Sequence, residues 1–178
     1  MTVGGRAADD TTATRSKKMP AATNSLPRFH VARPRLVATL REAPIGVVLA
    51  GGGYGKTVLA IELARALGIA CAVVRLEPGD DEPQLLVARL SRALRRSGLS
   101  DAADAVEPGH GDPSASVDRL VQVLSDSADP VLLVVDEVGH AGEASALLLL
   151  HLVEELPPGH RLLLVGRTLP PGLSRIAS

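Results

Sequence analysis

The sequence predicts an α/β fold in which a parallel β-sheet lies between two layers of helices. Three observations lead to this prediction. Short apolar runs alternate along the chain with longer segments of helical periodicity. The runs are apolar at consecutive positions, which is typical of strands that are buried on both faces. Gly, Pro or charged residues bound each run, as expected for strands that are joined by helical crossovers.

The individual elements follow from the same patterns. Pro34 suits the first turn of a short helix that continues through Glu42 and closes at Pro44. The expected strands are Ile45 to Ala50, Cys71 to Leu76, Val131 to Val135 and Leu162 to Val165. The other expected helices are Lys56 to Leu67, Glu82 to Arg96, Ser114 to Ser127 and Ala141 to Leu156. Pro108 to Pro113 is expected to be a mobile loop that joins two helices.

Length and composition set the number of domains. A chain of 178 residues suffices for one domain with a sizeable core. Residues 1–27 are rich in Ala, Thr, Ser and Gly, and we expect them to form a disordered leader. Residues 28–178 are expected to form one α/β domain.

Composition also excludes several classes of function. Hydrophobic residues make up 46% of the chain and aromatic residues only 1%, so the core is aliphatic and no stacking platform for nucleic acid is expected. A net charge of −1 gives no general attraction to DNA. The single cysteine, Cys71, and the lack of a membrane-length apolar run or secretory signal predict a cytoplasmic protein without a membrane partner. The five histidines lack the spacing of metal ligands.

The strongest motif lies between the first expected strand and the following helix. Its sequence, Ala-Gly-Gly-Gly-Tyr-Gly-Lys-Thr, matches the P-loop pattern except that Ala50 replaces the first Gly. Lys56 is expected to bridge the β- and γ-phosphates of ATP, and the Thr57 hydroxyl to coordinate Mg²⁺. The predicted nucleotide-binding residues here are Ala50, Gly51, Gly52, Gly53, Tyr54, Gly55, Lys56, Thr57 and Val58. The alternative is a Gly-rich turn that precedes Lys-Thr by chance.

Two further strand ends carry candidate residues. Asp136 and Glu137 follow the apolar run Val131 to Val135 in the manner of a Walker B strand. Asp136 would hold Mg²⁺ through water, and Glu137 would orient and polarise the attacking water. Arg167 follows the last apolar run and is expected beside the γ-phosphate, where it would sense or stabilise charge. Solvated charges that merely end buried strands are the alternative at all three positions.

Taken together, these motifs resemble those of the signal-transduction ATPases with numerous domains, in particular the nucleotide-binding domain of large LuxR-type regulators related to the maltose regulator MalT. The resemblance spans roughly residues 28–176 and depends on the order and spacing of the motifs. They are Arg33-Pro34, the P-loop with Tyr54, the acidic turn from Leu76 to Pro83, Asp136-Glu137 and Gly166-Arg167. Gly51 and Gly52 depart from the Pro-Ala that the family usually has.

The resemblance implies a P-loop NTPase three-layer sandwich with strand order 1-4-3-2 and an adenine site lined by Arg33 and Pro34. It implies that Arg167 faces the γ-phosphate and that ATP or ADP binds with Mg²⁺. It also implies a switch, in which ADP holds a closed monomer and ATP with an inducer promotes self-association. DNA would be bound only through a C-terminal domain beyond this chain. The family's fifth strand and helical lid would also follow Ser178, so the domain is expected to be truncated.

Other functions remain open at the level of sequence. A stand-alone P-loop phosphotransferase would share the motif, but it should also have an Arg-rich lid and an acceptor pocket, which the sequence does not show. A GTPase should carry an Asn-Lys-x-Asp guanine motif, which is absent. A degenerate interaction module would retain the fold without turning over nucleotide.

Overall fold

The predicted α/β fold is present, with one four-stranded parallel sheet in the order β1-β4-β3-β2. The computed structural model describes residues 26, 31–79, 81–107 and 111–177. The strands are β1 (Ile45–Leu49), β2 (Ala70–Arg75), β3 (Val131–Asp136) and β4 (Arg161–Gly166). The helices are α1 (Pro34–Glu42), α2 (Lys56–Leu67), α3 (Pro83–Arg96), α4 (Ser100–Ala105), α5 (Pro113–Ser125) and α6 (Glu143–Glu154), with short 3-10 helices η1 (Val138–His140) and η2 (Pro171–Ala177).

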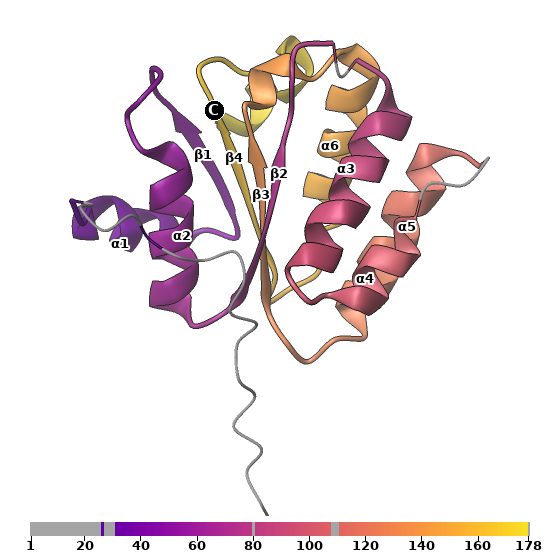
Figure 1. The fold of residues 1–178 in the computed structure, drawn as a ribbon, viewed down its shortest axis with the longest axis horizontal. Helices are drawn as coiled ribbons and strands as arrows, with labels where there is room; N and C mark the ends of the chain where they lie inside the picture. Colours follow the sequence, from indigo (N-terminus) through magenta and orange to yellow (C-terminus); the bar gives the residue numbers. More distant parts are fainter. Residues whose placement is uncertain (1–25, 27–30, 80, 108–110, 178) are drawn as a thin grey trace, which may run out of the picture.

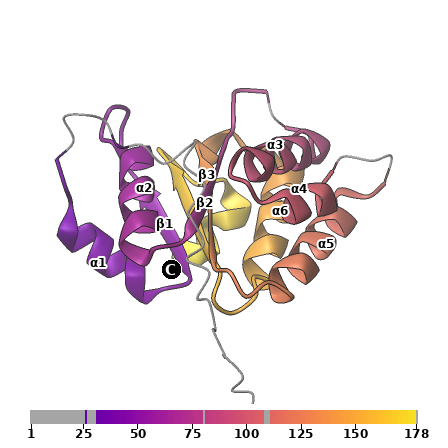
Figure 2. The same ribbon diagram turned by 60° about the horizontal axis from the view of Figure 1, so that its bottom comes forward.

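Helices cover both faces of the sheet, which makes a three-layer sandwich. α1 and α2 lie on one face, whereas α3 to α6 lie on the other (Figures 1 and 2). The inner strand β3 shows why both faces need cover, because all six of its residues are buried. Leu132 and Val134 pack in the core beneath α2, and Leu133 and Val135 pack in the larger core beneath the other helices. This alternation follows from the two-residue repeat of a strand.

The observed elements differ from the expected ones in ways that have physical causes. Strand and helix ends move by one or two residues, as helix-end and strand-end assignments commonly do. The last long helix begins at Glu143 rather than Ala141, with Gly142 as its N-cap. A methyl group added at Gly142 would lie 3.0 Å from the Asp81 Cα, so the Asp81 backbone leaves no room for a side chain there. α4, η1 and η2 were not expected from the sequence. α4 precedes the expected loop at Pro108, so this loop joins α4 to α5.

Two predictions fall largely outside the described residues. They are the leader of residues 1–27, of which only Leu26 is described, and the loop at Pro108, of which residues 108–110 are not described. Within the described part of the chain, no helix has both the length and the apolar character needed to cross a bilayer. Cys71 is buried, and burial raises the pKa of its thiol to about 12. The thiol therefore stays protonated at neutral pH, as a small apolar side chain of the core.

Candidate functional site: a phosphate loop at the carboxyl ends of the strands

The loop between β1 and α2 has the backbone geometry of a phosphate-binding turn. Gly53 and Gly55 have φ angles of 78° and 70°, a left-handed conformation that is accessible to Gly without strain. Gly55 is also the N-cap of α2, and its carbonyl accepts the first helical hydrogen bond, from the Leu59 amide at 3.0 Å. The loop therefore leads directly into a helix N-terminus, where unpaired amides and the helix dipole favour an anion.

Lys56 lies inside the curl of this loop. Its side chain is 7% exposed, and its Nζ donates hydrogen bonds to the carbonyls of Ala50 at 3.1 Å and Gly51 at 3.0 Å. Both partners are neutral, so no carboxylate of the described residues neutralises the ammonium here. A buried cation that is held by carbonyl dipoles alone provides a strong electrostatic attraction for a phosphate.

Thr57 and Asp136 bring two oxygen atoms together from distant parts of the chain. The Thr57 Oγ1 donates to Asp136 Oδ2 at 2.7 Å, which joins the first turn of α2 to the end of β3. The Asp136 carboxylate is 5% exposed, and its Oδ1 accepts a hydrogen bond from the Glu137 amide at 2.9 Å. A hydroxyl and a fixed carboxylate are hard oxygen ligands, which fit Mg²⁺. Among the described residues, no group of three or more His, Cys, Asp or Glu side chains could hold a metal ion by itself.

Glu137 occupies an unusual backbone position at the end of β3. Its φ of 55° and ψ of 42° place it in the left-handed region, and it is the only described non-Gly residue with a positive φ. Such a conformation costs a non-Gly residue on the order of 1 kcal/mol. The left-handed conformation of Glu137 turns the chain from β3 into η1, and Glu137 lines an open cleft beyond the end of the sheet. The half-buried carboxylate lies next to Asp136 and is accessible to water.

Arg167 approaches the phosphate loop from the end of β4. A methyl group added at Gly52 would lie 3.0 Å from an Arg167 guanidinium nitrogen, so this side chain lies directly against the loop. The Ala50 amide also donates to the Gly166 carbonyl at 3.0 Å, which ties the start of the loop to the same strand end. The structure thus brings Arg167, Lys56 and Thr57 to one edge of the sheet, where ligands of such sheets bind.

The remaining predicted residues surround the loop. An Arg33 guanidinium nitrogen donates to the Gly55 carbonyl at 3.4 Å, which links the start of α1 to the phosphate loop. Pro34 is the exposed first residue of α1, and Val58 is half-buried in the first turn of α2. The Tyr54 ring is 67% exposed and lies over Gly51, where an added methyl group would come within 3.2 Å of it.

Two residues near the site were missed by sequence reasoning. Arg75 and His140 line the same cleft as Glu137 and Arg167. The only sequence signal for Arg75 is a charge at the carboxyl end of a buried strand, and His140 was assigned no role. At the opposite edge of the sheet, Arg161 donates to the Ala43 carbonyl at 2.6 Å and so holds the end of α1 against the sheet.

The loops after β3 and β4 pack tightly against each other. A methyl group added at Gly139 would lie 2.7 Å from Thr168 Oγ1 and 3.1 Å from the Thr168 carbonyl oxygen. We therefore expect Gly139→Ala to lower the free energy of unfolding by about 1–3 kcal/mol, because the added group overpacks a backbone contact. Urea denaturation followed by circular dichroism measures the change.

Gly111→Ala is the matched control for that substitution. A methyl group added at Gly111 meets no atom within 4 Å, so its effect should stay within about 0.5 kcal/mol of zero. Equal effects of the two substitutions would show that the Gly139–Thr168 contact contributes nothing specific.

Comparison with solved structures shows the same fold in archaeal proteins. Cdc6p from Pyrobaculum aerophilum matches with a TM-score of 0.60 and 17% identity, over 85% of this chain and 45% of that one. The ORC2 protein of Aeropyrum pernix matches in its ADPNP–ADP complexes with a TM-score of 0.55 and 15% identity, over 86% of this chain and 45% of that one. Its ADP form gives a TM-score of 0.56 and 16% identity, over 86% and 46%. The chain therefore spans less than half the length of these proteins.

Sequence comparison identifies the family. No curated protein matches the chain. The family model described as "AAA domain" matches residues 39–168, a range that contains the phosphate loop, both acidic residues at the end of β3, and Arg167. Together with the strand order and the position of the loop, this match shows that the chain belongs to the AAA domain family of nucleotide-binding, ATPase-like domains.

Proposed function

We propose that this domain binds ATP and ADP with Mg²⁺ and hydrolyses ATP slowly, as the nucleotide switch of a signal-responsive transcriptional regulator. The observation that carries the proposal is the Thr57–Asp136 hydrogen bond of 2.7 Å beside a buried Lys56. It supports a binding site in which the Lys56 ammonium, the Thr57 hydroxyl and the Asp136 carboxylate are held in place before a ligand binds. That the ORC2 protein of Aeropyrum pernix was solved with ADP and with ADPNP supports the same ligands here.

Each residue has a defined part in the proposed hydrolysis. Lys56 and the amides of the loop would bind the phosphates, and Thr57 and Asp136 would hold Mg²⁺, which offsets negative charge on the phosphates. Glu137 would take a proton from the attacking water as the water oxygen forms a bond to the γ-phosphorus. The bond from the γ-phosphorus to the bridging oxygen breaks, and ADP keeps the electron pair. Arg167 would stabilise the charge on the transferred group.

The regulatory part of the proposal comes from the resemblance to MalT-like LuxR regulators. In such a switch, ADP would hold a closed monomer, whereas ATP would permit self-association of the full-length protein. DNA would be bound by a further domain rather than by these residues. The net charge of −1 and the low aromatic content of 1% support the view that this domain itself does not read DNA.

Calorimetric titration with ATP, ADP and GTP, with and without Mg²⁺, tests the proposal. We expect ATP and ADP to bind, Mg²⁺ to strengthen ATP binding, and phosphate to be released slowly to water. No binding of any nucleotide would instead favour a degenerate interaction module. Transfer of the γ-phosphate to a small acceptor would favour a phosphotransferase.

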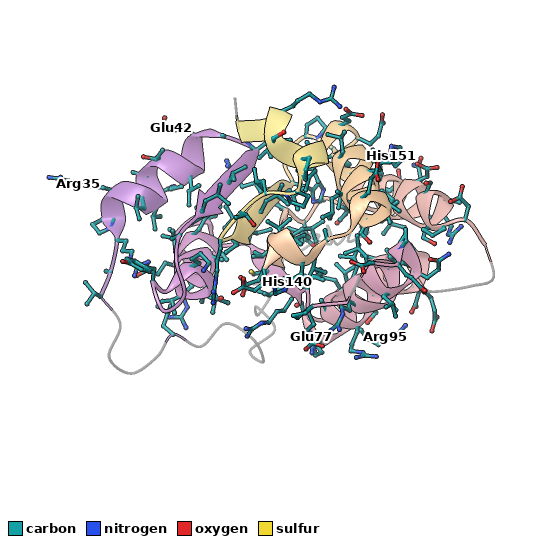
Figure 3. The ribbon with its side chains drawn as sticks, turned by 90° about the horizontal axis from the view of Figure 1, so that it is seen from above. Arg35, Glu42, Glu77, Arg95, His140 and His151 are labelled. Carbon is teal, nitrogen blue, oxygen red and sulfur yellow. The ribbon has the colours of Figure 1, made fainter. Side chains whose placement is uncertain are left out.

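Arg167→Ala should reduce the preference of the protein for ATP over ADP by about tenfold. The reason is that the guanidinium next to Gly52 would contact only the γ-phosphate, and a charge-assisted hydrogen bond of this kind contributes about 1.5–3 kcal/mol. The ratio of the two dissociation constants measures the effect. Arg35→Ala, at an exposed arginine of α1, is the control and should leave the ratio unchanged (Figure 3). Equal weakening of ATP and ADP by Arg167→Ala would remove the sensing role.

A further inference from the structure

A cleft of about 370 Å³ opens at the carboxyl ends of β2 and β3. It is lined by Arg75, Leu76, Glu77, Pro78, Glu137, His140 and Arg167. Figure 3 looks down on this edge of the sheet, where the labelled His140 comes from η1 and the labelled Glu77 from the segment between β2 and α3. The phosphate-binding role of the loop does not explain what this cleft binds.

Two arginines flank Asp136 on its two sides. Arg75 pairs in register with Asp136, and aligned residues of neighbouring parallel strands project from the same face of the sheet. That face is the one covered by α2, because Cys71 and Leu132, an aligned pair earlier in the same strands, both pack beneath α2. Arg167 lies on the other side of β3, at the end of β4. The two guanidiniums therefore border the expected position of the γ-phosphate from β2 and from β4.

The two guanidiniums of the cleft are available to an anion. Neither Arg75 nor Arg167 makes an ion pair or hydrogen bond with another side chain among the described residues. The Glu77 carboxylate is matched by Arg89, whose guanidinium donates to it at 2.9 Å. The His140 Nδ1 lies 3.4 Å from the Leu76 carbonyl and adds no negative charge. Glu137 is thus the one carboxylate of the cleft lining that has no cationic partner among the described residues.

Two guanidiniums in one cleft suit a phosphate ligand. The planar donor pairs of a guanidinium match the oxygens of a phosphate, and each such contact is a charge-assisted hydrogen bond.

We propose that Arg75 and Arg167 form a binding site for inorganic phosphate in this cleft, which receives the phosphate that hydrolysis releases. The inference rests on the proposed function for the origin of this phosphate, but not for the binding itself. Phosphate from solution has the same chemistry and would occupy the same site. Added phosphate should therefore slow turnover as a product inhibitor, and Arg75 should control how strongly it does so.

The binding test is a calorimetric titration of inorganic phosphate into the full chain saturated with ADP and Mg²⁺, at low ionic strength. We expect saturable binding that Arg75→Gln weakens about tenfold or more, because one of the two charge-assisted contacts is lost. Arg92→Gln, at an exposed arginine of α3, is the matched control and should bind phosphate like the unchanged protein. ADP should bind all three proteins within about twofold, and thermal denaturation checks that each is folded.

A second arm separates the two sources of phosphate. With ATP as substrate, added phosphate should inhibit steady-state hydrolysis at concentrations that match its dissociation constant, and it should inhibit Arg75→Gln about tenfold less strongly. Equal phosphate binding by Arg75→Gln and Arg92→Gln would overturn the inference, as would ADP binding without any phosphate binding. Phosphate binding that requires Arg75 in a protein that does not bind ADP would support the anion site and contradict the proposed nucleotide switch.

Discussion

Lys56→Ala is expected to weaken the binding of Mg-ATP at least about hundredfold. The Lys56 ammonium is buried within the loop and is held by two neutral carbonyls, at 3.1 and 3.0 Å. Its removal takes away both the positive charge and the hydrogen bonds that it would donate to phosphate, and hydrogen bonds to charged groups contribute about 1.5–3 kcal/mol each. Titration of the variant with ATP and with ADP measures the loss, which should affect both nucleotides.

Lys56→Met separates the charge from the packing. Met keeps much of the length and apolar volume of the Lys stem but carries no donor. Both variants should lose binding to a similar extent, while Lys56→Met should unfold at nearly the same urea concentration as the unchanged protein. If Lys56→Met kept an affinity for ATP within a few fold of normal, the loop would not bind phosphate through Lys56.

Glu137→Gln is expected to slow ATP hydrolysis by about 10²–10⁴-fold while it leaves ATP affinity within about threefold. Gln has the same shape as Glu, but its amide cannot take a proton from water. The Asp136 carboxylate keeps its hydrogen bonds to Thr57 and to the amide of residue 137, so the proposed Mg²⁺ ligands stay in place. Single-turnover release of phosphate measures the rate, and titration measures the affinity.

Glu143→Gln provides the control for this substitution. Glu143 is an exposed carboxylate in the first turn of α6, close in sequence but outside the cleft. Its variant should hydrolyse ATP at the normal rate. A normal rate in Glu137→Gln as well would mean that another group activates the water or that the measured hydrolysis comes from a contaminant.

The sequence predicts the sheet well because each strand is a short, strongly apolar run. Consecutive apolar residues of this kind are typical of parallel strands that are buried on both faces, so they are readily assigned to the sheet. The order β1-β4-β3-β2, by contrast, came from the family resemblance, since periodicity says nothing about which strands are neighbours. α4 was missed because Ser100–Ala105 is short, rich in Ala and Asp, and without a helical repeat of large apolar residues. Its helix depends on packing against α3 and α5 rather than on local preference.

The same distinction applies to the candidate site. The phosphate loop is contiguous in sequence, so its residues could be identified together, and the structure brings Thr57 of this loop to Asp136 at the end of β3. The contact of Arg33 with Gly55 joins distant segments and leaves no local pattern. Arg75 belongs to the cleft only because β2 pairs with β3, which the residue type alone does not reveal. The left-handed backbone of Glu137 likewise depends on the loops that pack around it.

Tyr54 provides an intrinsic fluorescence signal from the phosphate loop. The chain has no Trp and one Tyr, whose ring lies over Gly51 with 67% of its surface exposed. The intrinsic fluorescence of the protein at tyrosine wavelengths therefore comes from one ring at the mouth of the loop, without background from the core. Quenching of that emission can follow the arrival and departure of a ligand in real time, without a label and without a substitution near the loop.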